Sequence, residues 1–269
     1  MNFKNYIMSH AKKYFKPMLA HVYDSDKVNP KGWYMSEKID GIRAIWTGRE
    51  LLTRNNKQII APKWWIDQLP SIALDGELCL GRGKFQDTCS IVKTKSGEDK
   101  GWNKIIYNIF DAPFINMNFE YRIEKIKLIC KSVQGNIVPL PQICCIDREH
   151  LDKFMNQIIE LGGEGLMIRK PGSKYEFGKR SRTLLKIKRF YDQEAFVIEH
   201  IDGKGKHKGR LGALLCMDIE SKKQFKVGTG FTDKQRETPP PIGSIITYKY
   251  QETTKSGLPR FPVYLRIRQ

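Results

Sequence analysis

Lys38 is the residue in this sequence best placed to act as a nucleophile. It lies in the stretch Tyr34-Met35-Ser36-Glu37-Lys38-Ile39-Asp40-Gly41-Ile42-Arg43, between a strand-like run and an Asp-Gly turn. A lysine amine attacks phosphorus only when it is neutral, and nearby cations such as Arg43 or a bound metal favour the neutral form. Gly41 has no Cβ, which lets the backbone approach a phosphate. An ordinary surface lysine beside a turn is the competing interpretation.

Two carboxylates and one aromatic ring follow in an order that suits nucleotide chemistry. Glu77, at a predicted strand end, is placed to bind a ribose hydroxyl or a metal, or else is a turn carboxylate. Phe110 ends an apolar strand, where it either packs in the core or stacks on a purine, a contact worth roughly 1–3 kcal/mol per base. Glu164 lies in a glycine-rich turn. It is expected to be a metal ligand or, alternatively, a helix-terminal charge.

Lys186 and Lys188 form a pair of cations on one face of a predicted strand. They alternate with Leu185 and Ile187, and side chains two residues apart point to the same side of a strand. Two neighbouring cations repel each other unless an anion lies between them. A triphosphate would supply that anion, although a solvated basic strand face explains the same pattern.

The elements that must position these residues fall into two groups. Residues 1–15 are predicted to form a short basic helix, followed by an extended segment at 16–20. Strands are expected at 32–36, 43–47, 51–53, 72–74, 105–110, 137–140, 165–169 and 184–188, and helices at 61–68, 119–133 and 148–161. Beyond residue 193 the expected strands are 194–201, 212–219, 224–229, 244–250 and 262–267, without a long helix. This pattern predicts an α+β domain over 1–188, with antiparallel sheets and flanking helices, and a small five-stranded barrel over 189–269.

Composition points to a polyanionic partner. The 269 residues carry a formal net charge of +18, of which +7 lies from Lys188 onward and +11 before it. A folded basic surface of this kind favours nucleic acid, although a lysine bias of an AT-rich genome would also raise the charge. The six cysteines form no CxxC pair, and no export signal or membrane span is evident. We therefore expect a monomeric protein in a reducing, cytoplasmic or otherwise intracellular compartment, away from membranes.

Taken together, the motifs resemble those of the covalent nucleotidyltransferases, which include ATP-dependent DNA ligases, RNA ligases and mRNA capping enzymes. The stretches that carry the resemblance stand in the family's order: Lys38 to Arg43, Thr53-Arg54-Asn55, Asp75-Gly76-Glu77, Phe110-Asp111, Glu164-Gly165 and Lys186-Ile187-Lys188. Within the superfamily the chain is most similar to the minimal E-type ligases of bacteria and viruses, through residues 36–43, 74–83, 203–214 and 260–268. Those relatives have only an adenylation domain and an OB domain, and the absence of an export signal suggests a viral, phage or intracellular setting.

The resemblance implies an ATP- and Mg²⁺-dependent DNA ligase that seals nicks between a 5′-phosphate and a 3′-hydroxyl, in DNA repair or replication. Lys38 would carry AMP, which then passes to the DNA. The implied nucleotide contacts are Ser36, Glu37, Arg43, Arg54, Glu77, Phe110, Lys186, Lys188 and Arg268, and the implied metal ligands are Glu77 and Glu164. RNA ligation or GTP-dependent capping on the same scaffold stays open, and so does a nucleic-acid-binding module that has lost catalysis.

Nicked duplex DNA is the expected partner, and two basic segments are expected to contact it. Arg180 and Arg182 lie where the chain has one residue more than the usual Gly-Arg-Ser of the family. The second segment is a glycine-rich loop whose cations are Lys204, Lys206, Lys208 and Arg210, although a merely solvated loop would have the same composition. Gln269 stands where the resembling ligases often continue with an acidic residue and a lysine. Arg268 is therefore expected to orient the pyrophosphate without a downstream lysine.

Overall fold

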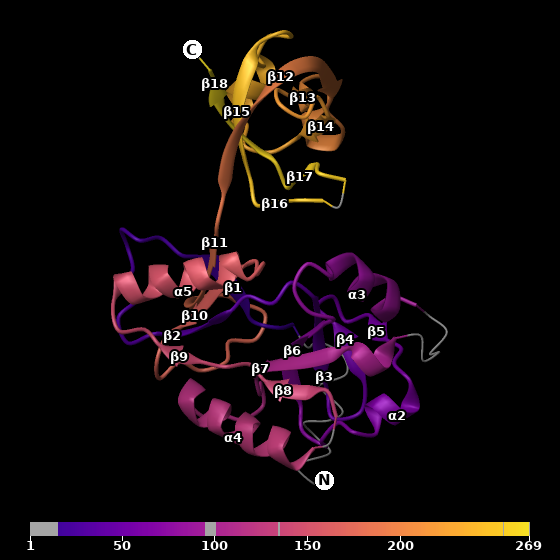
Figure 1. Cartoon of the computed structure of the whole chain (residues 1–269), viewed down its shortest axis with the longest axis vertical. Helices are drawn as coiled ribbons and strands as arrows, with labels where there is room; N and C mark the ends of the chain where they lie inside the picture. Colours follow the sequence, from indigo (N-terminus) through magenta and orange to yellow (C-terminus); the bar gives the residue numbers. More distant parts are fainter. Residues whose placement is uncertain (1–15, 95–100, 134, 255, 269) are drawn as a thin grey trace. The chain divides into compact units, whose positions relative to one another are not determined.

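A computed structural model describes residues 16–94, 101–133, 135–254 and 256–268 (Figure 1). The helix expected over residues 1–15 lies outside the described residues. The chain divides into two compact units, Met1–Ile187 and Lys188–Gln269. Within the described ranges, no helix is both long enough and apolar enough to cross a membrane.

Two sheets form the framework of the N-terminal unit. The first sheet has the order β1-β11-β10-β2-β9 and the second has the order β5-β4-β3-β6-β7-β8. The strands of the first sheet are β1 (Leu19–Val22), β2 (Tyr34–Glu37), β9 (Ile143–Cys144), β10 (Gly165–Arg169) and β11 (Arg180–Lys188). Those of the second are β3 (Ile42–Trp46), β4 (Leu51–Thr53), β5 (Gln58–Ile59), β6 (Leu74–Cys79), β7 (Ile106–Asp111) and β8 (Ile137–Pro139). The β1–β11 and β7–β8 ladders are parallel, and the β2–β10, β2–β9, β3–β4, β3–β6, β4–β5 and β6–β7 ladders are antiparallel.

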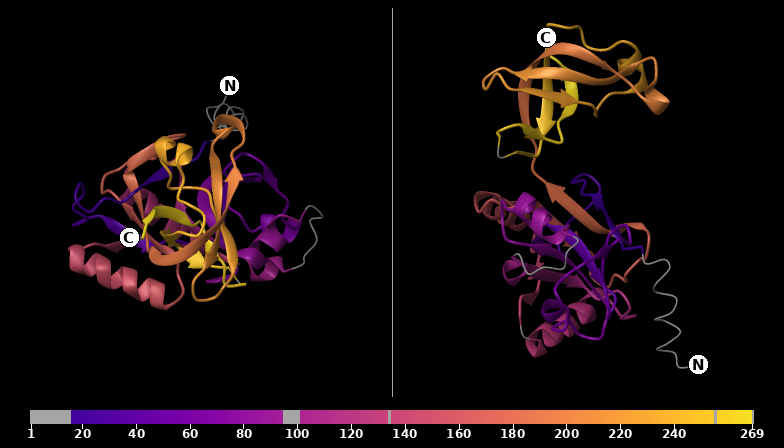
Figure 2. Two further views of the ribbon diagram at one scale, coloured as in Figure 1. Left: turned by 90° about the horizontal axis from the view of Figure 1, so that it is seen from above. Right: turned by 90° about the vertical axis from the view of Figure 1, so that its right-hand side faces the viewer.

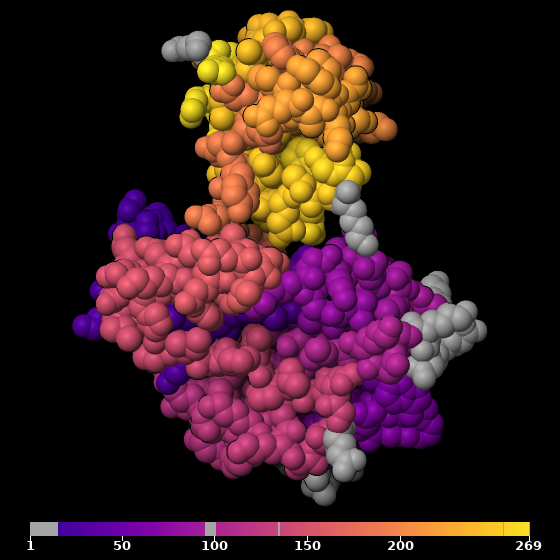
Figure 3. Space-filling model, in the orientation of Figure 1, coloured from indigo at the N-terminus to yellow at the C-terminus, as the bar shows by residue number. Residues whose placement is uncertain are grey.

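The long helices begin where the sequence pattern indicates. α4 (Phe119–Ser132) starts after Asn118, whose side chain accepts a hydrogen bond from the Tyr121 backbone N–H at 3.1 Å. α5 (Arg148–Glu160) starts after Asp147, whose side chain accepts a hydrogen bond from the His150 backbone N–H. α2 (Lys63–Ile66) follows Pro62, and η1 (Trp102–Lys104) precedes β7. α3 (Phe85–Val92) was not predicted. Its N-cap residue makes no side-chain hydrogen bond, so the usual start signal is missing. Side chains of α4 and α5 (pink) cover much of one face of this unit in the space-filling view (Figure 3).

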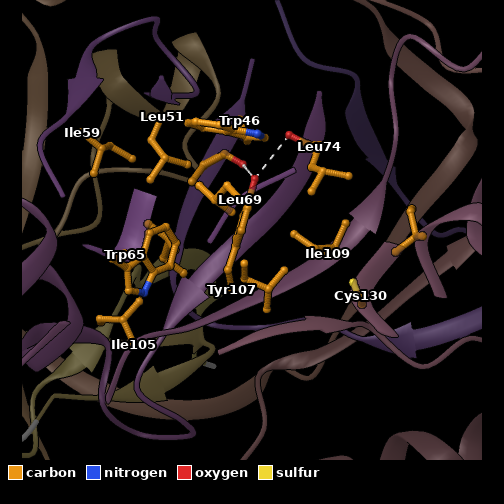
Figure 4. Packing of buried hydrophobic residues seen from close by; sticks show 14 of the residues in the cluster. Trp46, Leu51, Ile59, Trp65, Leu69, Leu74, Ile105, Tyr107, Ile109 and Cys130 are labelled. Carbon is orange, nitrogen blue, oxygen red and sulfur yellow. Dashed lines mark hydrogen bonds between the residues drawn. The ribbon is translucent and has the colours of Figure 1, made fainter. Parts of the chain in front are cut away.

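The main core packs the second sheet against α2, α3 and α4. Along β7 the burial alternates, so that Tyr107, Ile109 and Asp111 point inward while Phe110 is only partly buried. The Tyr107 hydroxyl donates to the carbonyl oxygens of Ala44 at 2.8 Å and Leu74 at 3.3 Å, inside this core (Figure 4). A buried hydroxyl of this kind needs a partner, and here neighbouring strands of the same sheet supply it.

The C-terminal unit is built on one antiparallel sheet of order β14-β13-β12-β15-β18. Its strands are β12 (Tyr191–Asp202), β13 (Leu211–Asp218), β14 (Gln224–Val227), β15 (Ile245–Tyr250) and β18 (Val263–Ile267), and its smaller elements are η2 (Gly205–His207), α6 (Asp233–Glu237), β16 (Glu252–Thr253) and β17 (Pro259–Arg260). The strands curl around a shared apolar core, as the orange and yellow ribbons of Figure 2 show. The two edges of the sheet meet at one parallel bridge, Thr229–Val263, rather than along a full ladder. A partly open barrel of five strands is the architecture of an OB-fold.

Candidate active site

Lys38 and Glu164 are brought together by the pairing of β2 with β10. Glu37 lies opposite Leu166 in this antiparallel ladder, and the Lys38 backbone N–H donates to the Gly165 carbonyl at 2.8 Å. The end of one strand therefore lies beside the start of the other. The Lys38 Nζ contacts the Glu164 Oε2, with 24% of the lysine side chain and 8% of the glutamate side chain exposed. The structure thus places a partly buried lysine against a nearly buried carboxylate.

Glu77 lies in the middle of β6 and not at a strand end as the sequence suggested, because the strand runs on to Cys79. It faces Arg43 in the β3–β6 ladder. The pKa of Glu77 is raised to about 8, chiefly by burial; Lys38 and Arg43 lower it, and the nearby carboxylates of Asp75 and Glu164 contribute to the rise. A second carboxylate therefore lies close to the Lys38–Glu164 pair, in surroundings that disfavour its ionised form.

Arg43 is neutralised by a buried acid. Its Nε donates to Asp75 Oδ1 at 2.9 Å and its Nη2 to Asp75 Oδ2 at 2.6 Å, and the Asp75 side chain is fully buried. Burial lowers the pKa of Arg43, but the Asp75 carboxylate more than compensates and the net shift is upward. Arg43, which the sequence suggested as a cation that favours the neutral form of Lys38, is therefore held in an ion pair with Asp75. Its guanidinium instead lies over the partly buried Phe110 ring, 5.3 Å from the centroid.

Gly41 lies against strand β6. A Cβ at this position would lie 2.3 Å from the Leu78 carbonyl oxygen and 2.9 Å from the Glu77 Cγ. The close approach that requires glycine is therefore to strand β6, at the point from which Glu77 projects.

Three of the predicted nucleotide contacts, Ser36, Glu37 and Arg54, lie in different surroundings. The Glu37 carboxylate accepts hydrogen bonds from Arg82 Nε and Nη2, each at 2.8 Å. The sequence did not indicate this bidentate ion pair. Ser36 is buried in β2, at 4% exposure. Arg54 is exposed in the turn after β4.

The basic residues of β11 divide between different surroundings. Leu185 and Ile187 pack into the apolar cluster beneath α5, so Lys186 points to the opposite face of the strand. The Lys188 Nζ donates to Gln251 Oε1 at 2.7 Å in the C-terminal unit. At the start of the strand, the Arg180 guanidinium contacts the Ala20 carbonyl and Arg182 is exposed.

Within the C-terminal unit, two of the predicted cations carry acidic partners. Arg268 forms an ion pair with Glu194. Arg210 is partly buried and lies 3.2 Å from Asp233 and 3.9 Å from Glu237. The remaining cations of the loop, Lys204, Lys206 and Lys208, are exposed. The loop thus offers three exposed charges rather than four.

A buried polar network next to the site was missed by the sequence reasoning. Asp111, fully buried at the end of β7, receives Arg122 Nε at 2.6 Å and Arg169 Nη2 at 2.7 Å. Tyr175 donates its hydroxyl proton to Asp75 at 2.6 Å. The only advance signal was an aspartate directly after each of two predicted apolar strands, where it could be buried, and a buried charge requires partners.

Comparisons with known proteins agree with this arrangement. A family model described as the ATP dependent DNA ligase domain matches residues 17–188, and one described as the DNA ligase OB-like domain matches residues 202–268. The DNA ligase of Haemophilus influenzae is 40% identical over 250 residues, which are 93% of this chain and 91% of that protein.

Solved structures give the same result. One reported in a structure–function analysis of Lig E DNA ligases superposes with a TM-score of 0.89 at 39% identity, covering 94% of this chain and 98% of that one. A Chlorella virus DNA ligase–adenylate gives a TM-score of 0.57 at 30% identity, covering 95% and 98%. These matches confirm the resemblance that the order of the motifs indicated.

Proposed function

Because the chain belongs to the ATP-dependent DNA ligase family, we propose that it seals nicks in duplex DNA with Lys38 as the residue that carries AMP. The observation that supports this assignment is the Lys38 amine held against Glu164, with Glu77 close by. We assign residues 1–188 to adenylation and residues 189–269 to an OB domain. RNA ligation and mRNA capping are not favoured, since the matching family models and relatives are DNA ligases.

The reaction has three steps. The neutral Lys38 amine attacks the α-phosphorus of ATP, a P–N bond forms, the bond to the pyrophosphate oxygen breaks, and the nitrogen loses a proton. A 5′-phosphate oxygen of the nick then attacks the adenylate phosphorus and releases the lysine. The 3′-hydroxyl finally attacks the 5′-phosphorus, and AMP leaves. Pyrophosphate and AMP are good leaving groups, so positioning and charge neutralisation supply most of the catalysis.

Residues of both sheets would act on the nucleotide. Lys38 must leave the Glu164 carboxylate before its nitrogen can attack. Phe110 presents a partly buried ring for adenine, and Lys186 offers a cation toward the phosphates. Glu77 faces Arg43 across the β3–β6 ladder and is placed near the ribose or the phosphates.

The carboxylates of Glu77 and Glu164 fit the number of protein ligands that a magnesium ion needs when substrate phosphates supply the others. Over the described ranges, the structure has no group of three or more His, Cys, Asp or Glu side chains that could hold a metal. Mg²⁺ is commonly bound through one or two carboxylates together with substrate phosphates. Burial and then the neighbouring carboxylates raise the pKa of Glu77, so a nearby cation would stabilise its ionised form. The ion would supply neutralisation of charge at phosphorus.

Labelling with ATP tests the nucleophile. Wild-type protein incubated with α-labelled ATP and Mg²⁺ should keep the label on a denaturing gel, whereas Lys38→Ala should not. Lys63→Ala is the matched control, because Lys63 lies in the same unit but is a highly exposed partner of Asp67. Lys38→Ala should still seal a nick that is already adenylated. Retained label in Lys38→Ala would remove Lys38 as the nucleophile, and labelling by GTP in place of ATP would favour capping.

A further inference from the structure

The proposed nucleotide site is assembled from two separate sheets. The first sheet supplies Lys38 and Lys186, together with Glu164 just before β10. The second supplies Glu77 from β6 and Phe110 from β7. Because catalysis depends on sub-ångström placement, whatever holds the two sheets in register also sets the geometry of the site.

A small apolar cluster provides part of this connection. Ile45 of the second sheet packs with Leu184 of β11 and with Met18, which directly precedes β1. Tyr175, in the segment between β10 and β11, belongs to the same cluster. Apolar packing brings the sheets together, but it tolerates sliding better than directional hydrogen bonds do.

Buried hydrogen bonds cross between the sheets at the same place. Tyr175 donates to Asp75 Oδ2 of β6 at 2.6 Å, and its oxygen accepts the Met18 backbone N–H at 3.1 Å. Arg169 of β10 donates to Asp111 of β7 at 2.7 Å. Asp75 and Asp111 lie opposite each other in the β6–β7 ladder and are both fully buried. The two acceptors therefore form one seam, and each receives one hydrogen bond from the side of the first sheet.

Tyr175 is connected to the site through one shared carboxylate. Asp75 Oδ2, which receives the Tyr175 hydroxyl, also receives Arg43 Nη2 at 2.6 Å. Arg43 in turn lies over the Phe110 ring and opposite Glu77. Loss of the tyrosine hydroxyl would leave the carboxylate one donor short and freer to rotate, and the guanidinium would move with it.

We propose that Tyr175 is a positioning residue for ATP, whose hydroxyl sets the orientation of Asp75 and Arg43 and so the placement of the adenosine-binding side of the site relative to Lys38. This inference rests on the proposed function of the site. It assigns Tyr175 no contact with the nucleotide. Its effect is confined to the first step and to ATP affinity.

Tyr175→Phe tests the proposal, with Tyr107→Phe as the matched control. Both tyrosines are buried in the same unit, but the Tyr107 hydroxyl bonds to backbone groups of the second sheet, among them the carbonyls drawn in Figure 4. Tyr175→Phe should raise the KM for ATP in self-adenylation by up to about tenfold, because the energy of one hydrogen bond to a charged group sets the upper limit on what the hydroxyl contributes to positioning. Sealing of a pre-adenylated nick should change much less. Tyr107→Phe should lose comparable thermal stability and keep the wild-type KM.

A double-mutant cycle with Arg43→Lys shows whether the effect passes through Arg43. In the Arg43→Lys background, Tyr175→Phe should raise the KM little further, since the group it positions has already been changed. An unchanged KM in Tyr175→Phe would overturn the proposal, and so would full additivity in the cycle or an equal rise in Tyr107→Phe. If wild-type protein formed no adduct with ATP, the proposed function would fail instead, which is a separate outcome.

Discussion

Gly41→Ala is expected to damage both stability and the first step of ligation. The added Cβ would lie 2.3 Å from the Leu78 carbonyl oxygen, whereas ordinary contacts begin at 3.4 Å, so one backbone must move by about 1 Å. Strand β6 cannot easily yield, because it is paired with β3 on one side and β7 on the other. The segment between Lys38 and Gly41 must therefore shift away from Glu77.

The size of both effects follows from this displacement. Overpacking of this kind typically costs about 1–3 kcal/mol of unfolding free energy. A shift of about 1 Å in a catalytic group can slow a reaction about 100-fold. All five tryptophans lie in the N-terminal unit, so urea unfolding followed by tryptophan fluorescence reports on the unit that contains Gly41. The rate of self-adenylation is measured with labelled ATP.

Gly228→Ala is the control, because a Cβ there would meet only Ala213 at 3.6 Å and Gly212 at 3.7 Å. Circular dichroism should place its stability within about 0.5 kcal/mol of the wild type, and its rate should be unchanged. If Gly41→Ala kept full stability without ATP and lost only ATP affinity, the glycine would serve the phosphate and not strand β6. That result would refute the close approach to Leu78 as the reason for a glycine at position 41.

Two further predictions concern charge. The pKa of Glu77 is raised from 4.5 to about 8 by burial, so the folded protein holds this proton over a pH range in which the unfolded chain has lost it. Without ATP and Mg²⁺, stability should therefore fall as pH rises through that range, and Glu77→Gln should flatten the fall in urea titrations; parallel curves would contradict the assignment. Replacing Lys204, Lys206 and Lys208 together by alanine should reduce the slope of log K for nicked DNA against log salt by roughly two to three, and an unchanged slope would place the DNA contacts elsewhere.

Much of the fold could be predicted because its signals are local. The α4 and α5 helices carry a capping side chain at the start and apolar residues at helical spacing, and the structure has both of them close to the predicted bounds. The order of short strands beyond residue 193 likewise indicated the OB architecture. α3 was not predicted because its N-cap residue, Lys84, makes no side-chain capping hydrogen bond. Where the local signal is absent, tertiary packing alone selects the helix.

Partnerships between distant residues could not be predicted in the same way. Asp75 and Tyr175 are separated by 100 residues and Arg43 and Asp75 by 32, yet both pairs share one carboxylate. Nothing in the spacing of these residues indicates which strands will lie side by side. A buried aspartate indicates that hydrogen-bonding partners are present. Which cations and hydroxyls lie within reach of it depends on the tertiary structure.

The three residues of the motif Asp75-Gly76-Glu77 have different roles in the structure. Asp75 is fully buried and serves Arg43 and Tyr175, and Gly76 is required because a Cβ would lie 2.5 Å from the Asn108 carbonyl oxygen. Only Glu77 remains partly exposed and close to Lys38. Two of the three residues therefore hold strands and side chains in place, and the third is the one proposed to contact the nucleotide. Because the position of Glu77 depends on β6, the same short stretch has to supply both the proposed nucleotide contact and the contacts that position it.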